Sequence, residues 1–269
     1  MPYAAVNGID LYYETHGSGP PLVFAHGSGG NHLSWWQQVP FFARHYTCIT
    51  FDHRSFGFSR DGVQPLGRAA FADDLRGLLD HLHLDQVAIV AHSMGGRTGV
   101  GFALRNPGRL RALVLSGSNG GSTSDESRRV WDEQQERNRA LPKGTIRGLA
   151  PAFVADHPER AFLYRQIMRL NPKHPTEFLR VPAGYRGSTH ERLAQQGIPI
   201  LYLVGEEDIV APPRTIEIAA SQIPGARLLV MPGAGHSTYY ERPERFNDSV
   251  LGFLREAYEP TLPARPGQG

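Results

Sequence analysis

A chain of 269 residues, of which 40% are hydrophobic and 20% charged, is long enough for one large globular domain or for a domain with an insertion. Its formal net charge is only +2 and its basic residues are spread out, which argues against a nucleic-acid partner. The single cysteine, Cys48, cannot form an internal disulfide, and no apolar segment is long enough to span a bilayer. The N-terminus lacks the basic start and apolar region of a signal peptide, so we expect a cytoplasmic protein without a membrane partner.

Apolar runs of strand length recur along the chain. The first, Ile9–Gly17, alternates apolar and polar residues, which is typical of an antiparallel strand. Six later runs are almost continuously apolar, as parallel strands covered on both faces require. These runs are 21–26, 46–52, 86–92, 111–117, 199–205 and 227–233.

Helical patterns lie between these runs. Residues 67–82 place Phe71, Leu75 and Leu78 on one face, and further helical stretches occupy 214–223 and 242–254. Strands that alternate with helices predict an α/β fold with a doubly wound, mostly parallel sheet.

The alternation stops once, between about residues 120 and 189. This stretch has helical pieces separated by prolines and no strong strand, so we predict a helical cap inserted into a core formed by residues 1–119 and 190–258. Some of its apolar side chains are expected to pack a small core of the cap, and others to face a cleft. Residues 259–269 are rich in proline and glycine, which is typical of a disordered tail.

Polar side chains follow three of the predicted strands. Ser93 comes after the run 86–92, Asp208 after 199–205 and His236 after 227–233. The carboxyl ends of parallel strands meet at one edge of a sheet, so we expect these three residues to lie together. A serine hydroxyl is a weak nucleophile that needs a base, and the base needs a carboxylate to hold its tautomer. The small residues Ala91 and Gly95 around Ser93 suit a sharp turn that presents the hydroxyl.

These segments resemble the α/β-hydrolase family from about Ile9 to Leu254. The resemblance rests on "HGSGG" (26–30), "DHRSFGFS" (52–59), "AHSMGG" (91–96), Asp208 in "GEEDIV" and His236 in "GAGHS". It implies an α/β-hydrolase core with a helical cap and no metal or organic cofactor. Ser93 would then be the nucleophile, His236 the base and Asp208 the acid.

The same resemblance implies an oxyanion hole formed by the backbone N–H groups of Ser28 and Met94. The sequence departs from the family pattern at two positions. Ala91 stands where the family usually has a glycine, which a small shift of the following helix would accommodate. Ser55 also replaces a glycine, which suggests a different local turn rather than a second nucleophile.

Other interpretations of these residues stay open. Ser93 could be a structural turn residue, and Glu206 or Glu207 could replace Asp208 as the acid, whereas Asn119 is a poor substitute for a carboxylate. His26 and His92 flank the motifs and are expected to be structural or pocket-lining. The other candidates for the substrate pocket are Trp35, Trp131, Phe162, Tyr164 and Met168.

The sequence therefore predicts a serine hydrolase that cleaves a small-molecule carboxylic ester or lactone through an acyl-enzyme. Hydrolysis of a C–C bond in ring-cleavage products, cofactor-free perhydrolysis and acyl transfer use the same three groups, so fold alone does not choose between them. A ligand receptor of the same fold that turns over slowly is an alternative from another functional class. No feature of the sequence indicates an oligomeric state.

Overall fold

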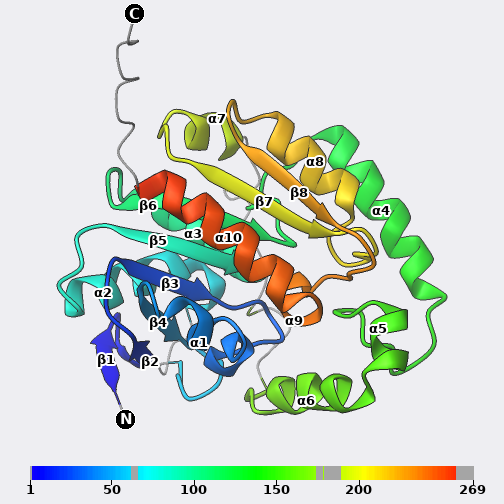
Figure 1. The fold of residues 1–269 in the computed structure, drawn as a ribbon, viewed down its shortest axis with the longest axis horizontal. Coiled ribbons are helices and arrows are strands. Elements are labelled where there is room, and N and C mark those ends of the chain that lie inside the picture. The colour runs from blue at the N-terminus through cyan, green and yellow to red at the C-terminus, as the bar shows by residue number, and fades with distance from the viewer. Residues whose placement is uncertain (1, 62–65, 174–177, 179–188, 259–269) are drawn as a thin grey trace, which may run out of the picture.

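The computed structural model describes residues 2–61, 66–173, 178 and 189–258, and within these ranges eight strands form one sheet (Figure 1). The predicted tail 259–269 lies outside the described residues. The strands are β1 Tyr3–Val6, β2 Ile9–His16, β3 Pro21–Ala25, β4 Thr47–Phe51, β5 Val87–His92, β6 Leu110–Ser116, β7 Ile200–Gly205 and β8 Arg227–Met231.

The sheet runs in the order β1-β2-β4-β3-β5-β6-β7-β8. β1 and β2 are antiparallel to their neighbours and the remaining strands are parallel, which confirms the predicted α/β class with a mostly parallel sheet. The sequence analysis missed β1. It pairs with β2 through a turn in which Asn7 and Gly8 have φ values of 44° and 76°, the left-handed conformation that tight hairpins need.

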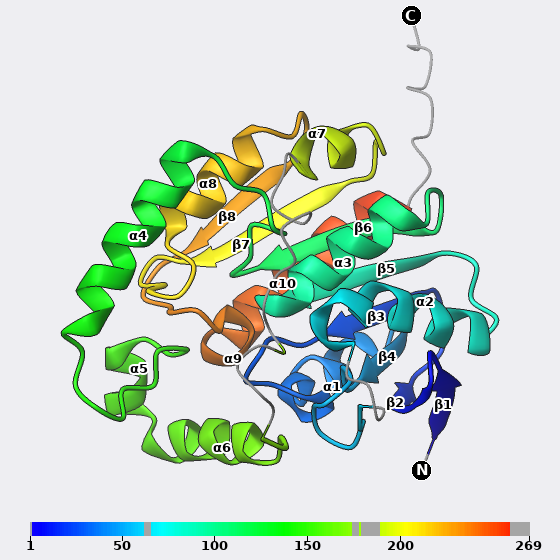
Figure 2. The same ribbon diagram turned by 180° about the vertical axis from the view of Figure 1, so that it is seen from behind.

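Helices cover both faces of the sheet, as Figures 1 and 2 show from opposite sides. Buried residues of α2, α3 and α8 pack with one face in one apolar cluster, and those of α1 and α10 pack with the other face in a second cluster. The helices are η1 His32–Trp35, α1 Val39–Phe42, η2 Gly67–Ala70, α2 Phe71–His81, α3 Met94–Arg105, α4 Asp125–Arg139, α5 Pro151–Asp156, α6 Pro158–Arg169, α7 Thr189–Ala194, α8 Pro213–Ser221, α9 Thr238–Glu241 and α10 Pro243–Tyr258.

The segment from 120 to 189 contributes α4, α5 and α6, which extend from α8 past the end of the sheet to α9 (Figures 1 and 2). Its buried side chains Phe153, Ala161 and Ile167 belong to the apolar cluster that covers the α10 face. These three residues therefore pack against the main domain, and the expectation that other apolar side chains of the segment form a small core stays a prediction. The division of the chain at 119 and 190 stays a prediction.

The loop after β4 is fixed by buried charges. Arg54 is 1% exposed and donates two hydrogen bonds of 2.6 Å to the carboxylate of Asp74. Asp52 accepts from the backbone N–H groups of His32 and Phe58, at 2.6 and 2.8 Å. Ser55 has a φ of 64°, which is the left-handed conformation that glycine also adopts. The serine therefore takes a backbone conformation open to the family's glycine, and its side chain does not require a different turn. Among the described residues, no helix is both long and apolar enough to cross a membrane.

Candidate active site

Ser93 lies at the apex of the turn from β5 into α3. Its backbone has φ 49° and ψ −112°, a sparsely populated conformation for a residue with a side chain. The turn is held because the N–H of Ser93 donates to the carbonyl of Ser116 at 2.9 Å and the N–H of Gly96 donates to the carbonyl of Ser93 at 3.0 Å. The turn places Ser93 on the wall of two pockets.

Small residues make this turn possible. A Cβ added to Gly95 would lie 2.3 Å from the carbonyl oxygen of Ala25, so the start of α3 passes directly against the end of β3. A Cβ at Gly99 would lie 3.7 Å from the Cβ of Ala91. That distance is an ordinary contact, so the methyl group of Ala91 fits beside α3 without crowding it, whereas the same Cβ would lie 2.9 Å from Cδ1 of Leu113.

His236 is held by a buried carboxylate. Its Nδ1–H donates to Oδ2 of Asp208 at 2.8 Å, and Asp208 is 2% exposed. The other oxygen, Oδ1, accepts from the backbone N–H groups of Val210 and Ala211, both at 2.8 Å. Gly117, with φ 55°, allows the imidazole to lie against the end of β6, because a Cβ there would be 2.9 Å from Nδ1 of His236.

The two neighbouring glutamates are placed differently. Glu206 is exposed and accepts from the backbone N–H of Gly233 at 3.2 Å, and Glu207 is also exposed. The carboxylate bonded to His236 is that of Asp208.

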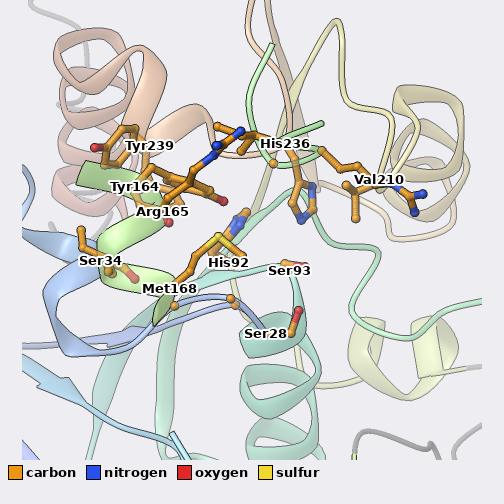
Figure 3. Close-up of a pocket in the computed structure, with 18 of the residues that line it drawn as sticks. Ser28, Ser34, His92, Ser93, Tyr164, Arg165, Met168, Val210, His236 and Tyr239 are labelled. Atoms are coloured by element: carbon orange, nitrogen blue, oxygen red, sulfur yellow. The ribbon is translucent and has the colours of Figure 1, made fainter. Parts of the chain in front are cut away.

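Ser93 and His236 line the same pocket of about 400 Å³, and Figure 3 shows the imidazole of His236 directed toward Ser93. Since Nδ1 is bonded to Asp208, the Nε2 atom is the ring nitrogen left for a proton from the serine. The structure thus places Ser93 and His236 on one pocket, with Asp208 bonded to the opposite side of the imidazole.

The loop after β3 passes close to Ser93. A Cβ at Gly27 would lie 3.2 Å from the Cβ of Ser93 and 2.8 Å from Cδ2 of His92. Only glycine lets the backbone that leads into Ser28 approach this closely. Met94 is the first residue of α3, so its N–H has no partner four residues earlier within the helix. Both N–H groups predicted for an oxyanion hole therefore belong to backbone adjacent to the serine.

His26 and His92 do not compete with His236 as bases. Burial lowers the pKa of His26 to about 4, and its Nδ1–H donates to the carbonyl of Gly27 at 2.8 Å while its Nε2 accepts from the N–H of His53 at 3.0 Å. Burial, with the neighbouring His236, holds the pKa of His92 well below its usual range, and its Nδ1–H donates to Ser116. Both rings therefore stay neutral and position backbone around the site.

The candidate pocket residues divide into two groups. His92, Tyr164 and Met168 line the pocket of about 400 Å³, and Trp131 lines a second pocket of about 600 Å³ that shares Ser93 and His236. The other three do not line either pocket: His26 and Trp35 are 0% exposed within the core, whereas Phe162 is 63% exposed at the surface.

The α6 helix is tied to the loops that frame Ser93. The hydroxyl of Tyr164 lies 2.9 Å from Oγ of Ser237, the residue after His236. At the C-terminal end of α6, the side-chain amide of Asn31 donates to the carbonyl of Ile167 at 2.9 Å. The side-chain amide of Asn171 donates to the carbonyl of Gly29 at 3.2 Å. Displacement of α6 would therefore disturb both the His236 loop and the predicted oxyanion loop.

Sequence reasoning missed two arginines and one glutamate near the site. Arg68 and Arg97 line the pocket of about 600 Å³. Arg97 lies four residues after Ser93, one helical turn along α3, a spacing that could have indicated its place beside the serine.

Glu241 is buried and accepts from the N–H groups of Ala150 and Gly235 at 2.9 and 3.0 Å. Burial raises its pKa to about 7 against the effect of these bonds.

Comparisons with known proteins identify the family and the fold of the chain. A family model described as alpha/beta hydrolase fold matches residues 20–188, and one described as TAP-like protein matches residues 178–266. A relative from Azorhizobium caulinodans, named "Putative carbamate hydrolase RutD", is 28% identical over 95% of this chain and 99% of its own. A thermophilic esterase from Thermogutta terrifontis has a TM-score of 0.79 at 28% identity, covering 96% of this chain and 99% of that one. An enol-lactonase from Burkholderia xenovorans has a TM-score of 0.75 at 25% identity, covering 94% and 100%.

Proposed function

The chain belongs to the α/β-hydrolase family, and we propose that it hydrolyses a small-molecule carboxylic ester or lactone with Ser93 as the nucleophile. The observation that carries the proposal is the 2.8 Å bond between His236 and the buried Asp208, on a pocket that Ser93 also lines. The esterase and the enol-lactonase similar to this chain support the choice of substrate class.

In the proposed first half-reaction, Oγ of Ser93 attacks the substrate carbonyl carbon while Nε2 of His236 takes the hydroxyl proton. Asp208 stabilises the imidazolium that forms. The carbonyl oxygen becomes an oxyanion, which accepts hydrogen bonds from the backbone N–H groups of Ser28 and Met94. Such donors lower the barrier because they are in place before the charge develops, and one of them is typically worth about 10²–10³ in rate.

Collapse of the tetrahedral intermediate breaks the bond to the leaving oxygen, which takes the proton from His236. The product is an alcohol, or the free hydroxyl end of an opened lactone, and an acyl group on Ser93. His236 then removes a proton from water, which attacks the acyl carbon. The second tetrahedral intermediate breaks its bond to Oγ of Ser93, which takes the proton back from His236, and the carboxylic acid is released. His92 and His26 remain neutral in this scheme because burial lowers the pKa of both rings.

A fluorophosphonate probe tests the nucleophile. We expect one label per chain, on Ser93, and no label on Ser93→Ala that retains the wild-type circular dichroism spectrum. Ser28→Ala is the matched control, because only the backbone N–H of Ser28 takes part in the proposal. Labelling of Ser93→Ala at another serine would contradict the assignment.

Turnover separates an enzyme from a slow ligand receptor. We expect many molecules of p-nitrophenol per chain from p-nitrophenyl butanoate, with the rate lost in Ser93→Ala. Release of a single equivalent would favour the receptor. Turnover of ring-cleavage products with none of any ester would favour the C–C bond hydrolase.

A further inference from the structure

The second pocket beside Ser93 has a positively charged wall. It has a volume of about 600 Å³ and shares Ser93 and His236 with the smaller pocket, but it opens on the side of α3 and α4. Its described lining includes three arginines and one carboxylate: Arg68, Arg97, Arg128 and Asp132. Arg128, which is bonded to Asp125, and Asp132 are both exposed, whereas Arg68 and Arg97 are only partly exposed.

Arg68 and Arg97 come from separate elements, η2 and α3, and line the same pocket. Burial, and after it the charge of Arg97, lowers the pKa of Arg68 to about 10. Arg68 therefore keeps its charge at neutral pH, as arginine side chains ordinarily do in proteins. Gly121 permits this arrangement, because a Cβ there would lie 2.7 Å from Nη1 of Arg97. An anion bound in this pocket would be attracted by both positive charges.

The smaller pocket also contains arginines, but their setting differs. Arg147 and Arg165 are exposed, and each donates to a backbone carbonyl, at Asn138 and Gly144 respectively. Charges in contact with solvent are screened, so they attract an anion weakly. Arg68 and Arg97 are only partly exposed, and they line the pocket together with hydroxyl and amide groups of Ser118, Asn119 and Thr123.

We propose that Arg68 and Arg97 form an anion-binding subsite that holds a carboxylate carried by the substrate while Ser93 attacks its ester or lactone carbonyl. The inference rests on the proposed function, which it deepens by assigning a charged substrate class. Both arginines have other interaction partners within the protein. The subsite requires only that their positive charge faces the pocket, where a planar guanidinium can pair with a carboxylate.

The test compares esters that differ in one charge. The first pair is p-nitrophenyl hydrogen adipate and its methyl ester, which place the charge in the acyl part. The second pair is 4-carboxyphenyl butanoate and its methyl ester, which place it in the leaving group. We expect kcat/KM in one pair to be at least about tenfold higher for the anion, the typical size of a charge-assisted hydrogen bond. The preference should fall as sodium chloride is added.

Arg68→Gln and Arg97→Gln should each reduce the ratio of anionic to neutral kcat/KM by about tenfold or more. Arg68→Lys and Arg97→Lys keep the charge and should keep part of the ratio, which separates loss of charge from misfolding. Arg105→Gln is the matched control. Arg105 lies on the same helix as Arg97 but is paired with Asp73 outside the pocket. This variant should keep the wild-type ratio.

Calorimetry of adipate binding to Ser93→Ala gives a readout that needs no turnover, and Arg97→Gln in that background should weaken binding. If no ester is hydrolysed and no probe labels Ser93, the proposed function fails, while the binding measurement still judges the subsite. If neutral esters are hydrolysed as well as anionic ones in both pairs, and adipate does not bind, the anion subsite is wrong and the hydrolase proposal stands.

Discussion

The strand ends and the segment from 120 to 189 both line the Ser93 cleft, but they are held very differently. Asp208 and His236 are buried at the edge of the sheet and tied by hydrogen bonds of 2.8 Å, whereas Trp131 and Met168 are 47% and 41% exposed. The sheet fixes the groups that would perform the chemistry, because any displacement costs several hydrogen bonds at once. The surface segment offers side chains that can change without disturbing the sheet, so selectivity among substrates is best sought there.

The largest effect in this comparison should come from the buried carboxylate. We expect Asp208→Asn to lower kcat by up to about 10⁴, because an amide that donates to Nδ1 favours the wrong imidazole tautomer. The melting temperature should change little, since the asparagine carbonyl can still accept from Val210 and Ala211. The measurement is kcat on p-nitrophenyl butanoate with a thermal melt. Glu206→Gln and Glu207→Gln are the matched controls, and an equal loss in either of them with none in Asp208→Asn would show that the acid is misassigned.

A second test concerns the close approach of α3 to the sheet. Gly95→Ala puts a methyl group 2.3 Å from the carbonyl oxygen of Ala25, so the helix or the strand must move. We expect the free energy of unfolding to fall by about 3 kcal/mol, the upper part of the usual range for overpacking. Urea unfolding measures it.

Gly252→Ala is the control for that test. Gly252 lies in α10 with open space around its Cβ position, so alanine should stabilise the helix by up to about 1 kcal/mol. Effects of the same sign in both variants would contradict the argument that the Ser93 turn depends on a glycine at this place.

Much of the sheet could be predicted from the sequence because strands buried on both faces are almost continuously apolar. β1 was missed because it has only four residues and its apolar side chains do not alternate with polar ones, although the Asn7-Gly8 pair is a hairpin signal. The expectation that Ser93, Asp208 and His236 lie together followed from a general rule about strand ends, and the short motifs around each residue supported it.

The pocket was harder to predict because burial depends on neighbours far away in the chain. Trp35 is buried since Phe24 and Tyr239 pack against its ring at centroid distances of 5.2 and 4.7 Å, and no residue near it in sequence indicates this. Arg68 was missed for a similar reason, since η2 and α3 line one pocket only in the folded chain, whereas the spacing of Arg97 from Ser93 was a usable signal.

A third test addresses the joint between the two regions. Glu241, in α9, accepts from Gly235 beside His236 and from Ala150 at the start of α5. Its pKa is raised to about 7 in the folded protein, so between about pH 4.5 and 7 the folded state binds more protons than the unfolded state. The contribution of this group to stability is therefore present at low pH and is lost as the pH rises through 7.

Glu241→Gln removes this titration and keeps an oxygen that can accept the same bonds. Wild type loses this contribution as the pH rises, and the variant does not. The free energy of unfolding of the variant relative to that of wild type should therefore increase by about 2 kcal/mol between pH 5 and pH 7.5. Urea unfolding at three pH values gives the difference. Glu244→Gln, at an exposed position in α10, tests for a general effect of removing one negative charge. A difference for Glu241→Gln that does not vary with pH would show that the carboxyl is ionised throughout.

The smallest expected effect concerns the exposed segment itself. The terminal methyl of Met168 lies against Gly29, since a Cβ there would be 2.9 Å from Cε, and Met168 lines the smaller pocket beside Tyr164. For wild-type protein acting on p-nitrophenyl esters, we expect kcat/KM to rise from the acetyl to the butanoyl or hexanoyl ester and then to fall. Each buried methylene contributes up to about 0.8 kcal/mol until the pocket is full.

Met168→Ala enlarges that pocket and should move the optimum toward longer acyl chains, with changes of a few-fold for each ester and no loss of Ser93 labelling. Phe162→Ala is the matched control from the same helix. Its ring is 63% exposed and lines neither pocket, so the chain-length profile should match that of wild type. Trp131→Ala and Tyr164→Ala extend the series to one residue from each pocket. A profile that is flat in wild type and in Met168→Ala, Trp131→Ala and Tyr164→Ala would mean that the segment covers the site without selecting the substrate. The difference between the two regions would then be one of rigidity alone.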